Sequence, residues 1–533
     1  MRGVATVASL AVMLAAGVAW GAAAATQEAG GGAFVLEIGH DTTRVMGPIA
    51  PDGTIDYGHA LWQAMHEGVT QENNGYAVLM GMAAKFKEVP EKLTEGGDSG
   101  HDPADDSARH VWKAGEYPGI AAWLKENEGV LDGARELMET EKGRELTRWC
   151  PPEPAMGAVF DSWPFGARLN GIINALAARA MERLGSGDQA GARADAELLV
   201  RLGELVGSEP VFVAATMGRW LELDACRVAV AGSRTGTAAE KRQWLAFVQG
   251  MPELRVNPEV SDMDLRFESL GEVMKIVRGD VAGGLQELTL LDVEEMFVPG
   301  AGGGGRLKAG DLEQVDWNEV MRKINAQADE EVRIAEEPGV KAYRDAKALA
   351  DRVDKADVPG NVFDAVLGPS LESPEKGTVA DHEKSLEDQV NAFVKRRVGE
   401  SAAAFSDRIA AWVTRAGGEA FDVFPVDALN AEAIQRASAV AIGLEIYKAE
   451  HGAYPATLGA LVPGILKEVP EDPWSADGAA LGYAQEKGEY AVYSVGSSGK
   501  DRPRAEGVLR AREAVYSDKW AEKTAAGPSS TRP

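Results

Sequence analysis

The stretch that decides how the last part of this chain folds is YKAEHGAYPATLGALVPGILKEVPEDPWSADGAALGYAQEKGEYAVYSVGSSGKD, from Tyr447 to Asp501. It opens on the end of a predicted helix, where Gly452 supplies the left-handed residue that commonly ends helices. Tyr454-Pro455 predicts an extended exit, because proline disfavours a helical conformation in the residue before it. The runs 481–485 and 489–495 predict the two strands of a hairpin. The stretch therefore predicts a small α+β unit.

Four neighbouring features complete this unit. Asn430 is placed to cap a helix whose apolar stripe runs through residues 434–447. Residues 458–461 are predicted to form a short helical turn that packs back on that helix. The loop Pro470-Glu471-Asp472-Pro473-Trp474 is expected to be rigid and to deliver a large aromatic side chain to the core. Ala514-Val515-Tyr516 is the predicted closing strand.

These motifs resemble the C-terminal globular domain of the major pseudopilin of type II secretion systems. The resemblance covers residues 431–501 and rests on Tyr447, Gly452-x-Tyr454-Pro455-x-x-Leu458-x-x-Leu461-x-Pro463, Pro470-x-Asp472-Pro473-Trp474, Tyr483 and Tyr490-x-x-Tyr493-Ser494-x-Gly496. It implies that Tyr454, Pro455, Asp472, Pro473 and Trp474 are structural residues of a pseudopilin-like module.

The resemblance also implies a calcium site, which that family holds in the loop after the Tyr-Ser-x-Gly strand. The family uses a backbone carbonyl and successive aspartates there, which are the hard oxygen ligands that calcium requires. In this chain the loop reads Ser497-Ser498-Gly499-Lys500-Asp501 and keeps one carboxylate. Because Asp501 is alone and Lys500 is beside it, we expect that the calcium site is lost and that the module needs no cofactor.

The N-terminal residues 1–25 have the pattern of a secretory signal peptide. Arg2 is followed by an uncharged apolar run, 4–20, and by small residues at 21–25. We expect a cleaved Sec-type signal and a periplasmic or extracellular protein with no stable membrane insertion afterwards. The alternative is an N-terminal membrane anchor, because the run is close to membrane-spanning length. A pseudopilin instead has a short leader and an apolar helix leading straight into the module, so we do not expect filament assembly.

Charge and cysteine content narrow the class of protein. The chain of 533 residues has 55 Lys and Arg against 83 Asp and Glu, which gives a formal net charge of −28. This balance argues against nucleic acid as a partner, since phosphate contacts need clustered basic residues, and it disfavours anionic membrane surfaces. Cys150 and Cys226 form either a disulfide, as an oxidising compartment allows, or two separately buried thiols.

The rest of the chain predicts an irregular helical body. Periodic apolar residues predict successive helices in 165–184, 190–206 and 210–230. Gly185-Ser186-Gly187-Asp188 predicts a helix stop followed by an N-cap. The run 175–192 resembles the helical hairpin of tetratricopeptide-like repeats, although no 34-residue period is sustained. The phrases at 48–57, 67–74 and 315–318 resemble large uncharacterised secreted bacterial proteins.

We therefore expect a mainly α fold, in which an irregular helical-hairpin body carries a small C-terminal α+β module. The expected division is a signal peptide (1–25), an N-terminal mostly helical region (26–160), a helical-hairpin domain (161–299), a Gly-rich linker (300–310), an amphipathic helical region (311–427), the pseudopilin-like module (428–516) and a disordered tail (517–533).

One cluster has potential metal ligands, namely His101, Asp105, Asp106 and His110. Asp106 and His110 are four residues apart on a predicted helix, and imidazole with carboxylate suits zinc or iron. Aspartate at a helix start is also expected for capping alone, and Arg109 inside the cluster disfavours a cation. No Gly-x-Ser-x-Gly or His-Glu-x-x-His motif is present, and we assign no catalytic residue.

The leading interpretation is a non-catalytic interaction or structural protein of the cell envelope, with an unidentified protein partner and no cofactor. A metal-dependent hydrolase that uses the His101–His110 cluster is the first alternative. An accessory component of a secretion apparatus is the second.

Overall fold

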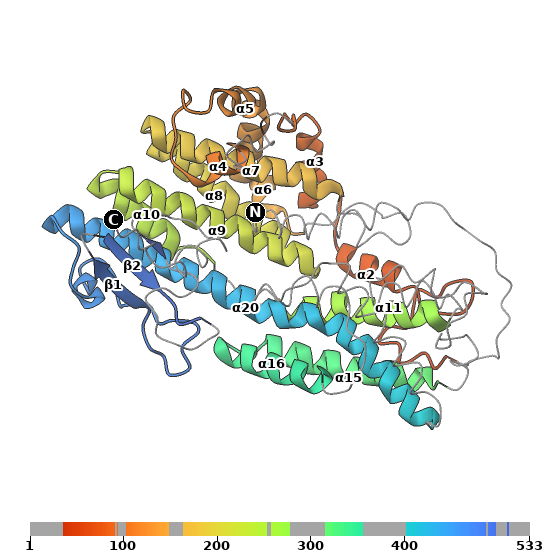
Figure 1. The fold of residues 1–533 in the computed structure, drawn as a ribbon. Coiled ribbons are helices and arrows are strands. Elements are labelled where there is room, and N and C mark those ends of the chain that lie inside the picture. The colour runs from red at the N-terminus through yellow and green to blue at the C-terminus, as the bar shows by residue number, and fades with distance from the viewer. Residues whose placement is uncertain are drawn as a thin grey trace, which may run out of the picture.

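The computed structural model describes residues 36–90, 93, 103–148, 164–252, 257–277, 315–354, 401–486, 489–496 and 509–510. The expected signal peptide, Gly-rich linker and C-terminal tail lie outside these residues. The described chain is mainly helical and has one small antiparallel sheet near its end (Figure 1). The prediction of a mainly α fold is therefore confirmed for the described residues.

The elements are, in chain order, α2 (Tyr57–His66), α3 (Gly75–Ala83), α4 (Pro103–Arg109), α5 (Pro118–Glu139), α6 (Glu141–Glu145), α7 (Pro164–Ser186), α8 (Gln189–Gly207), α9 (Phe212–Thr235), α10 (Ala238–Gln249), the π-helix η2 (Val260–Leu265), α11 (Arg266–Val277), α15 (Trp317–Ala335), α16 (Val340–Asp354), α20 (Ala402–His451), the 3₁₀ turn η3 (Leu458–Leu461), β1 (Gly482–Glu486), β2 (Glu489–Tyr493) and β3 (Leu509–Arg510).

The longest of these elements is α20, a single helix of 50 residues that runs through the molecule (Figure 1). At 1.5 Å per residue it is about 75 Å long. Ser401 caps its first turn by accepting from the backbone N–H of Ala404 at 3.2 Å. Gly452 ends it with a φ of 81°, as the sequence predicts. Helices α9, α10, α11, α15 and α16 pack along it, so α20 is the element on which the fold is assembled.

The continuity of α20 corrects two predictions. The helix start predicted at Asn430 and the domain boundary predicted between residues 427 and 428 both lie inside this helix. Pro425 lies inside it as well, although proline interrupts the backbone hydrogen bonds of a helix. Trp412 before the proline and Leu429 after it are both buried, so packing holds the helix on each side. Tertiary contacts thus override the local helix-breaking pattern.

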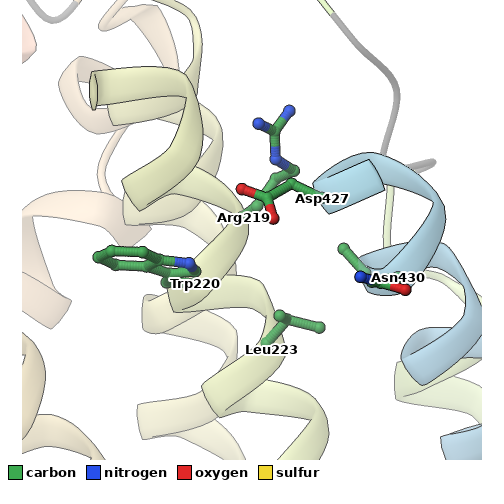
Figure 2. A pocket seen from close by; sticks show the side chains of 6 residues that line it. Arg219, Trp220, Leu223, Asp427 and Asn430 are labelled. Atoms are coloured by element: carbon green, nitrogen blue, oxygen red, sulfur yellow. The ribbon is translucent and has the colours of Figure 1, made fainter. Parts of the chain in front are cut away.

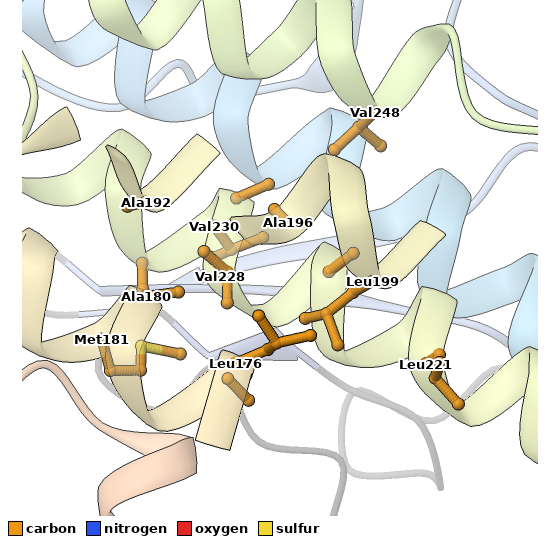
Figure 3. Close-up of a cluster of buried hydrophobic side chains, with 14 of the residues drawn as sticks. Leu176, Ala180, Met181, Ala192, Ala196, Leu199, Leu221, Val228, Val230 and Val248 are labelled. Atoms are coloured by element: carbon orange, nitrogen blue, oxygen red, sulfur yellow. The ribbon is translucent and has the colours of Figure 1, made fainter. Parts of the chain in front are cut away.

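The largest hydrophobic core among the described residues, called here the large core, lies between α3–α10, the second half of α20 and the C-terminal sheet. Figure 3 shows its centre, where side chains of α7, α8, α9 and α10 meet; those labelled are Leu176, Ala180, Met181, Ala192, Ala196, Leu199, Leu221, Val228, Val230 and Val248. Many of these side chains are small, which lets the helices approach closely.

Glycines mark the closest helix contacts in the large core. A Cβ atom on Gly218 of α9 would lie 2.6 Å from the carbonyl oxygen of Gly203 and 2.7 Å from the Cα of Gly207, both on α8. The predicted stop between α7 and α8 is also present. Gly187 has a φ of 88°, and the Asp188 side chain caps α8 by accepting from a backbone N–H in its first turn.

The next largest core, called here the second core, joins segments that are far apart in the sequence. It holds side chains from residues 55–65, α11, α15 and the first half of α20; the largest are Phe267, Trp317, Phe405 and Trp412. Because α2 packs on α11, whereas α3 and α5 belong to the large core, the region predicted as one unit over 26–160 divides between the two cores.

Ion pairs fasten the N-terminal segment to the second core. Arg44, a non-glycine residue with a φ of 59°, contacts Asp262 of η2 at 3.0 Å. Arg266 of α11 contacts the same carboxylate at 2.8 Å and Asp329 of α15 at 2.7 Å. Since the Arg266 side chain is fully buried, these charge-assisted contacts fix α11 against α15.

The C-terminal sheet has the order β1-β2-β3, and both pairs of neighbours are antiparallel. β1 and β2 form the predicted hairpin, in which Glu486 faces Glu489 and Gly482 faces Tyr493. The third strand is β3, where the sequence predicts none. The predicted closing strand, 514–516, lies outside the described residues. The short turn η3 packs on α20 as expected.

Candidate functional site

The motif residue Tyr454 ties the described residues after α20, called the module from here on, to the end of that helix. Its hydroxyl donates to the Glu445 carboxylate at 2.7 Å. The Lys448 ammonium lies 4.3 Å from the centre of the same ring, and the Tyr490 ring meets it edge-on at 4.7 Å. Burial, followed by the hydrogen bond to Glu445, raises the pKa of Tyr454. Tyr454 is therefore a neutral hydrogen-bond donor, which suits a structural role.

Asp472 joins the Pro-rich loop to the end of β2. Its carboxylate accepts from the backbone N–H of Trp474 at 3.0 Å, from the Ser494 hydroxyl at 2.7 Å and from the backbone N–H of Val495 at 2.7 Å. The residue is 3% exposed. Three donors on one buried carboxylate hold the loop and the strand end in one fixed arrangement.

Trp474 joins the module to two helices of the body. Its indole N–H donates to the side-chain oxygen of Asn430 on α20 at 3.1 Å. Its ring meets that of Tyr343 on α16 at a tilt of 74°, with centroids 5.0 Å apart. Leu429 and Ala433 of α20 complete the contact. Trp474 thus reaches a core, as predicted, and Asn430 holds the indole instead of capping a helix.

The two prolines of the motif are both buried in the same region. The carbonyl of Pro455 accepts from the Tyr483 hydroxyl of β1 at 2.8 Å. Pro473 stands between Asp472 and Trp474 in the loop just described. The five motif residues therefore lie at the junctions between the sheet, α20 and α16, and they do not converge on one cavity.

The predicted metal cluster is only partly within the described residues. His101 and the side chain of Asp105 lie outside them. His110 is exposed, and its Nδ1 lies 3.2 Å from the backbone carbonyl of Asp106. Among the described residues, no group of three or more His, Cys, Asp or Glu side chains is arranged to hold a metal ion. Asp501, the remaining carboxylate of the calcium loop, lies outside the described residues.

Cys226 lies on α9, where its thiol is free and fully buried. This agrees with the second of the two alternatives for the cysteines, a buried thiol. The Cys226 Sγ lies 3.8 Å from the Sδ of Met251. Burial, with a smaller contribution from Glu222, raises the pKa of the Cys226 thiol to about 12, so this sulfur is an unreactive apolar group at neutral pH. Cys150 lies outside the described residues.

A hollow that the sequence did not indicate lies between α9 and α20, just after Pro425. It contains about 270 Å³ of empty space, part of it open to solvent, and is lined by Arg219, Trp220, Leu223, Asp427, Asn430 and Ala431. Figure 2 shows Arg219 and Asp427 side by side, with Asn430 and Leu223 further along the two helices. Only a small part of this space is enclosed, so the hollow is much smaller than typical ligand pockets, which measure about 300–1,000 Å³.

Glu222 lies buried one turn from that hollow, at the contact between α8 and α9, and is 5% exposed. Its Oε2 has no hydrogen-bond partner among the described residues. Burial, followed by the nearby Glu204 carboxylate, raises the pKa of Glu222 to about 8, while Arg219 acts in the opposite direction. Glu222 is therefore largely protonated at neutral pH. The sequence does not indicate that Glu222 is buried, because Arg and Glu three residues apart are typical of a solvated helix face.

Asp264 is a second buried acid that sequence patterns do not reveal. It lies in η2, and its Oδ2 accepts from the backbone N–H of Phe212 at 2.6 Å. It thereby caps the first turn of α9, whose own N-cap residue, Val211, contributes no side-chain hydrogen bond. Burial raises the pKa of Asp264 well above its usual value. This cap comes from a residue 52 positions away, so no local motif marks it.

Neither a scan of protein-family models nor searches of curated proteins and of solved structures found a match to this chain. Within the part of the chain that the structure describes, none of the helices combines the length and the apolar character needed to span a membrane.

Proposed function

We propose that this chain is a non-catalytic interaction protein of the cell envelope, periplasmic or secreted, that carries a pseudopilin-like module on a helical body. The observation that carries the proposal is the continuity of α20, which belongs to the large core, the second core and the module junction at once. A module fixed in this way presents its outer surface in one orientation. Such preorganisation lowers the entropy that a binding partner must lose.

The packing around α20 also supports a role other than that of a filament subunit. Helices α9, α10, α11, α15 and α16 already cover this helix within one chain. In the pseudopilin family the long helix leads straight into the module, and here the same arrangement is enclosed by the body. The surface left for a partner is therefore that of the module and of the outer helices.

The test compares surface variants of the full chain, because deleting residues 428–516 would remove half of α20 from the large core. Ala456 and Ala479 are exposed on the module, and both are changed to Arg. Ala84 and Ala122, exposed next to α3 and on α5, are changed to Arg in the control chain. Each chain is cross-linked in envelope extracts, the captured proteins are identified by mass spectrometry, and the purified candidates are bound again to the purified chain.

We expect one partner to be retained by the unmodified chain and by the control chain and to be lost with the module variant. Capture that is unaffected by the module variant, or recovery of the chain in the cytoplasmic fraction after osmotic shock, would contradict the proposal. A captured component of a secretion apparatus would place the chain among accessory factors of that apparatus.

A further inference from the structure

The outer edge of β1 has unpaired backbone groups whose positions follow from the strand register. Glu486 and Glu489 flank the hairpin turn, so this pair and every second pair after it exchange backbone hydrogen bonds. Gly482, Ala484 and Glu486 therefore direct their N–H and C=O groups toward β2. Tyr483 and Gln485 direct theirs to the opposite side, away from the sheet.

A second observation assigns the same residues to the outer edge of β1. The strip Pro470–Asp472 pairs with the residues just before β1 through two bonds, from the N–H of Leu481 to the carbonyl of Pro470 at 3.1 Å and from the N–H of Asp472 to the carbonyl of Ala479 at 2.8 Å. Leu481 thus points its N–H to the outer edge, and Tyr483 and Gln485 follow in alternation. Among the described residues, nothing pairs with the backbone groups of Tyr483 and Gln485 on that edge.

The pairing of the strip with the chain before β1 ends at Pro470, because the residues before Pro470 pack against α20. The backbone N–H groups of Ile465 and Leu466 both donate to the carbonyl of Leu461, which folds this segment into a turn. The same three side chains lie within 3.4–3.6 Å of the position of a Cβ atom on Gly443 of α20. β2, not β1, lies on the side of α20 (Figure 1). The edge beside Tyr483 and Gln485 therefore remains uncovered by this segment.

The charges beside this edge indicate the kind of segment that fits it. Glu471 on the strip, Asp477 on the loop between the strip and β1, and Glu468 just before the strip are exposed. The cations in this region are Lys467, which is exposed, and Arg436 of α20, whose guanidinium donates to the carbonyl of Glu471 at 2.7 Å. The whole chain has a formal charge of −28. A second copy of this chain would bring the same negative charge, whereas a basic segment would be attracted.

We propose that the outer edge of β1 takes an extended segment of a partner protein, rich in lysine or arginine, as an additional strand. Main-chain bonds to Tyr483 and Gln485 supply the register, and the exposed acids Glu468, Glu471 and Asp477 select the charge. The inference rests on the proposed function, since it names the partner class for the module. It also goes beyond that function, because a partner that binds elsewhere on the module would satisfy the proposed function without using this edge.

The test uses proline at an edge position. Gln485→Pro removes the outward N–H and leaves the ladder with β2 intact, because the Gln485–Tyr490 pair exchanges no backbone bond. Gln485→Ala is the matched control, since it keeps the N–H. The N–H of Ala484 points toward β2, so Ala484→Pro should break the hairpin. Circular dichroism and limited proteolysis of this variant provide the reference for a broken hairpin, and Gln485→Pro should differ from it in both measurements.

The probe is a short blocked peptide of alternating lysine and valine, titrated to millimolar concentration against the full chain and followed by fluorescence anisotropy and by hydrogen exchange. We expect slower exchange of the amides of Tyr483 and Gln485 on binding. Loss of main-chain bonds should weaken binding about tenfold in Gln485→Pro, and Gln485→Ala should bind within a factor of about two of the unmodified chain. Peptides with alternate amides N-methylated, or with glutamate for lysine, should not protect the edge.

Equal binding by Gln485→Pro and Gln485→Ala, or no protection of this edge at any peptide concentration, would overturn the inference. The partner captured in the envelope experiment separates the two proposals. If that partner still binds Gln485→Pro, the module is an interaction surface and the edge is not its site. If no partner depends on the module, the proposed function fails, whatever the peptide does.

Discussion

The two halves of α20 are buried in different ways. Ahead of Pro425 the helix presents large side chains to the second core, including Phe405 and Trp412. After it, Ala437, Ala439 and Ala441 face the large core together with aliphatic side chains such as Ile442. Large side chains fill the space between well-separated helices, whereas small ones allow helix backbones to approach. The first half of α20 should therefore be sensitive to loss of side-chain volume, and the closest helix contacts of the large core to its addition.

The largest effect is expected from removing volume in the second core. Trp412 is 1% exposed, and Trp412→Ala should lower the free energy of unfolding by about 4 kcal/mol, because it leaves a cavity that its neighbours cannot fill. Val440→Ala, in the second half of the same helix, removes less and should cost about 1 kcal/mol. Denaturant unfolding followed by circular dichroism measures both. Similar losses for the two variants would break the comparison.

The opposite change should be severe in the large core. Gly218→Ala places a Cβ against the backbone of α8 and should cost about 3 kcal/mol, since backbone atoms cannot move aside as a flexible side chain would. The control is Gly129→Ala on α5, where the added Cβ would meet no atom within 4 Å. That variant should gain about 0.5–1 kcal/mol from helix propensity. Equal stability of the two variants would show that α8 and α9 are not in backbone contact.

Glu222 makes the tight α8–α9 contact sensitive to pH. Its pKa is raised from the ordinary 4.5 to about 8 in the folded chain, so the folded state holds a proton that the unfolded state releases. The associated stability is fully present below pH 4.5 and is lost as pH rises through about 8. We expect a fall of roughly 2 kcal/mol between pH 5 and pH 8, after allowance for partial solvent access. Glu222→Gln should remove this contribution, and the fall that remains belongs to other buried acids such as Asp264, whose pKa is also raised.

The measurement is the free energy of unfolding of both chains at several pH values. The groups around Glu222 are Arg219 and Cys226 on its own helix and Glu204 on α8. Parallel pH profiles for the unmodified chain and for Glu222→Gln would rule out a role for this carboxyl group.

The smallest effect concerns the contact that joins the module to α20. Asn430→Ala leaves the Trp474 indole N–H without its acceptor and should cost about 1 kcal/mol, since the gain in helix propensity offsets part of the loss. Asn430→Ser is the informative comparison. Serine would replace asparagine well as a helix cap, but it is too short to reach the indole. Retained stability in Asn430→Ser would favour the capping role that the sequence predicts.

The sequence correctly predicted features that depend on neighbouring residues, such as helix ends, a helix cap and a hairpin. Gly452 ends α20 in the left-handed region, Asp188 caps α8, and the hairpin lies where its alternating residues indicate. Each of these features depends on a few neighbouring residues. The motif Asp472-Pro473-Trp474 likewise predicted a buried indole, although not the helix α16 on its far side.

The features that the sequence did not reveal depend on partners far along the chain. The sequence predicted a helix start at Asn430, whereas burial on both sides of Pro425 keeps α20 continuous through Asn430. Residues 55–65 share a core with α15 and α20, which no short-range pattern indicates. The buried acids Glu222 and Asp264 look like ordinary surface carboxylates until the packing of α8, α9 and η2 is known.

The continuity of α20 can be measured directly. Ala404 and Ala449 are exposed near its two ends and accept spin labels as cysteines, in a background where Cys150 and Cys226 are replaced. Because the rise is 1.5 Å per residue, one unbroken helix places the two positions about 65–70 Å apart, and pulsed electron spin resonance should give one narrow distance in that range. A shorter or broad distribution, as from a break at Asn430, would contradict a helix shared by both cores and the module.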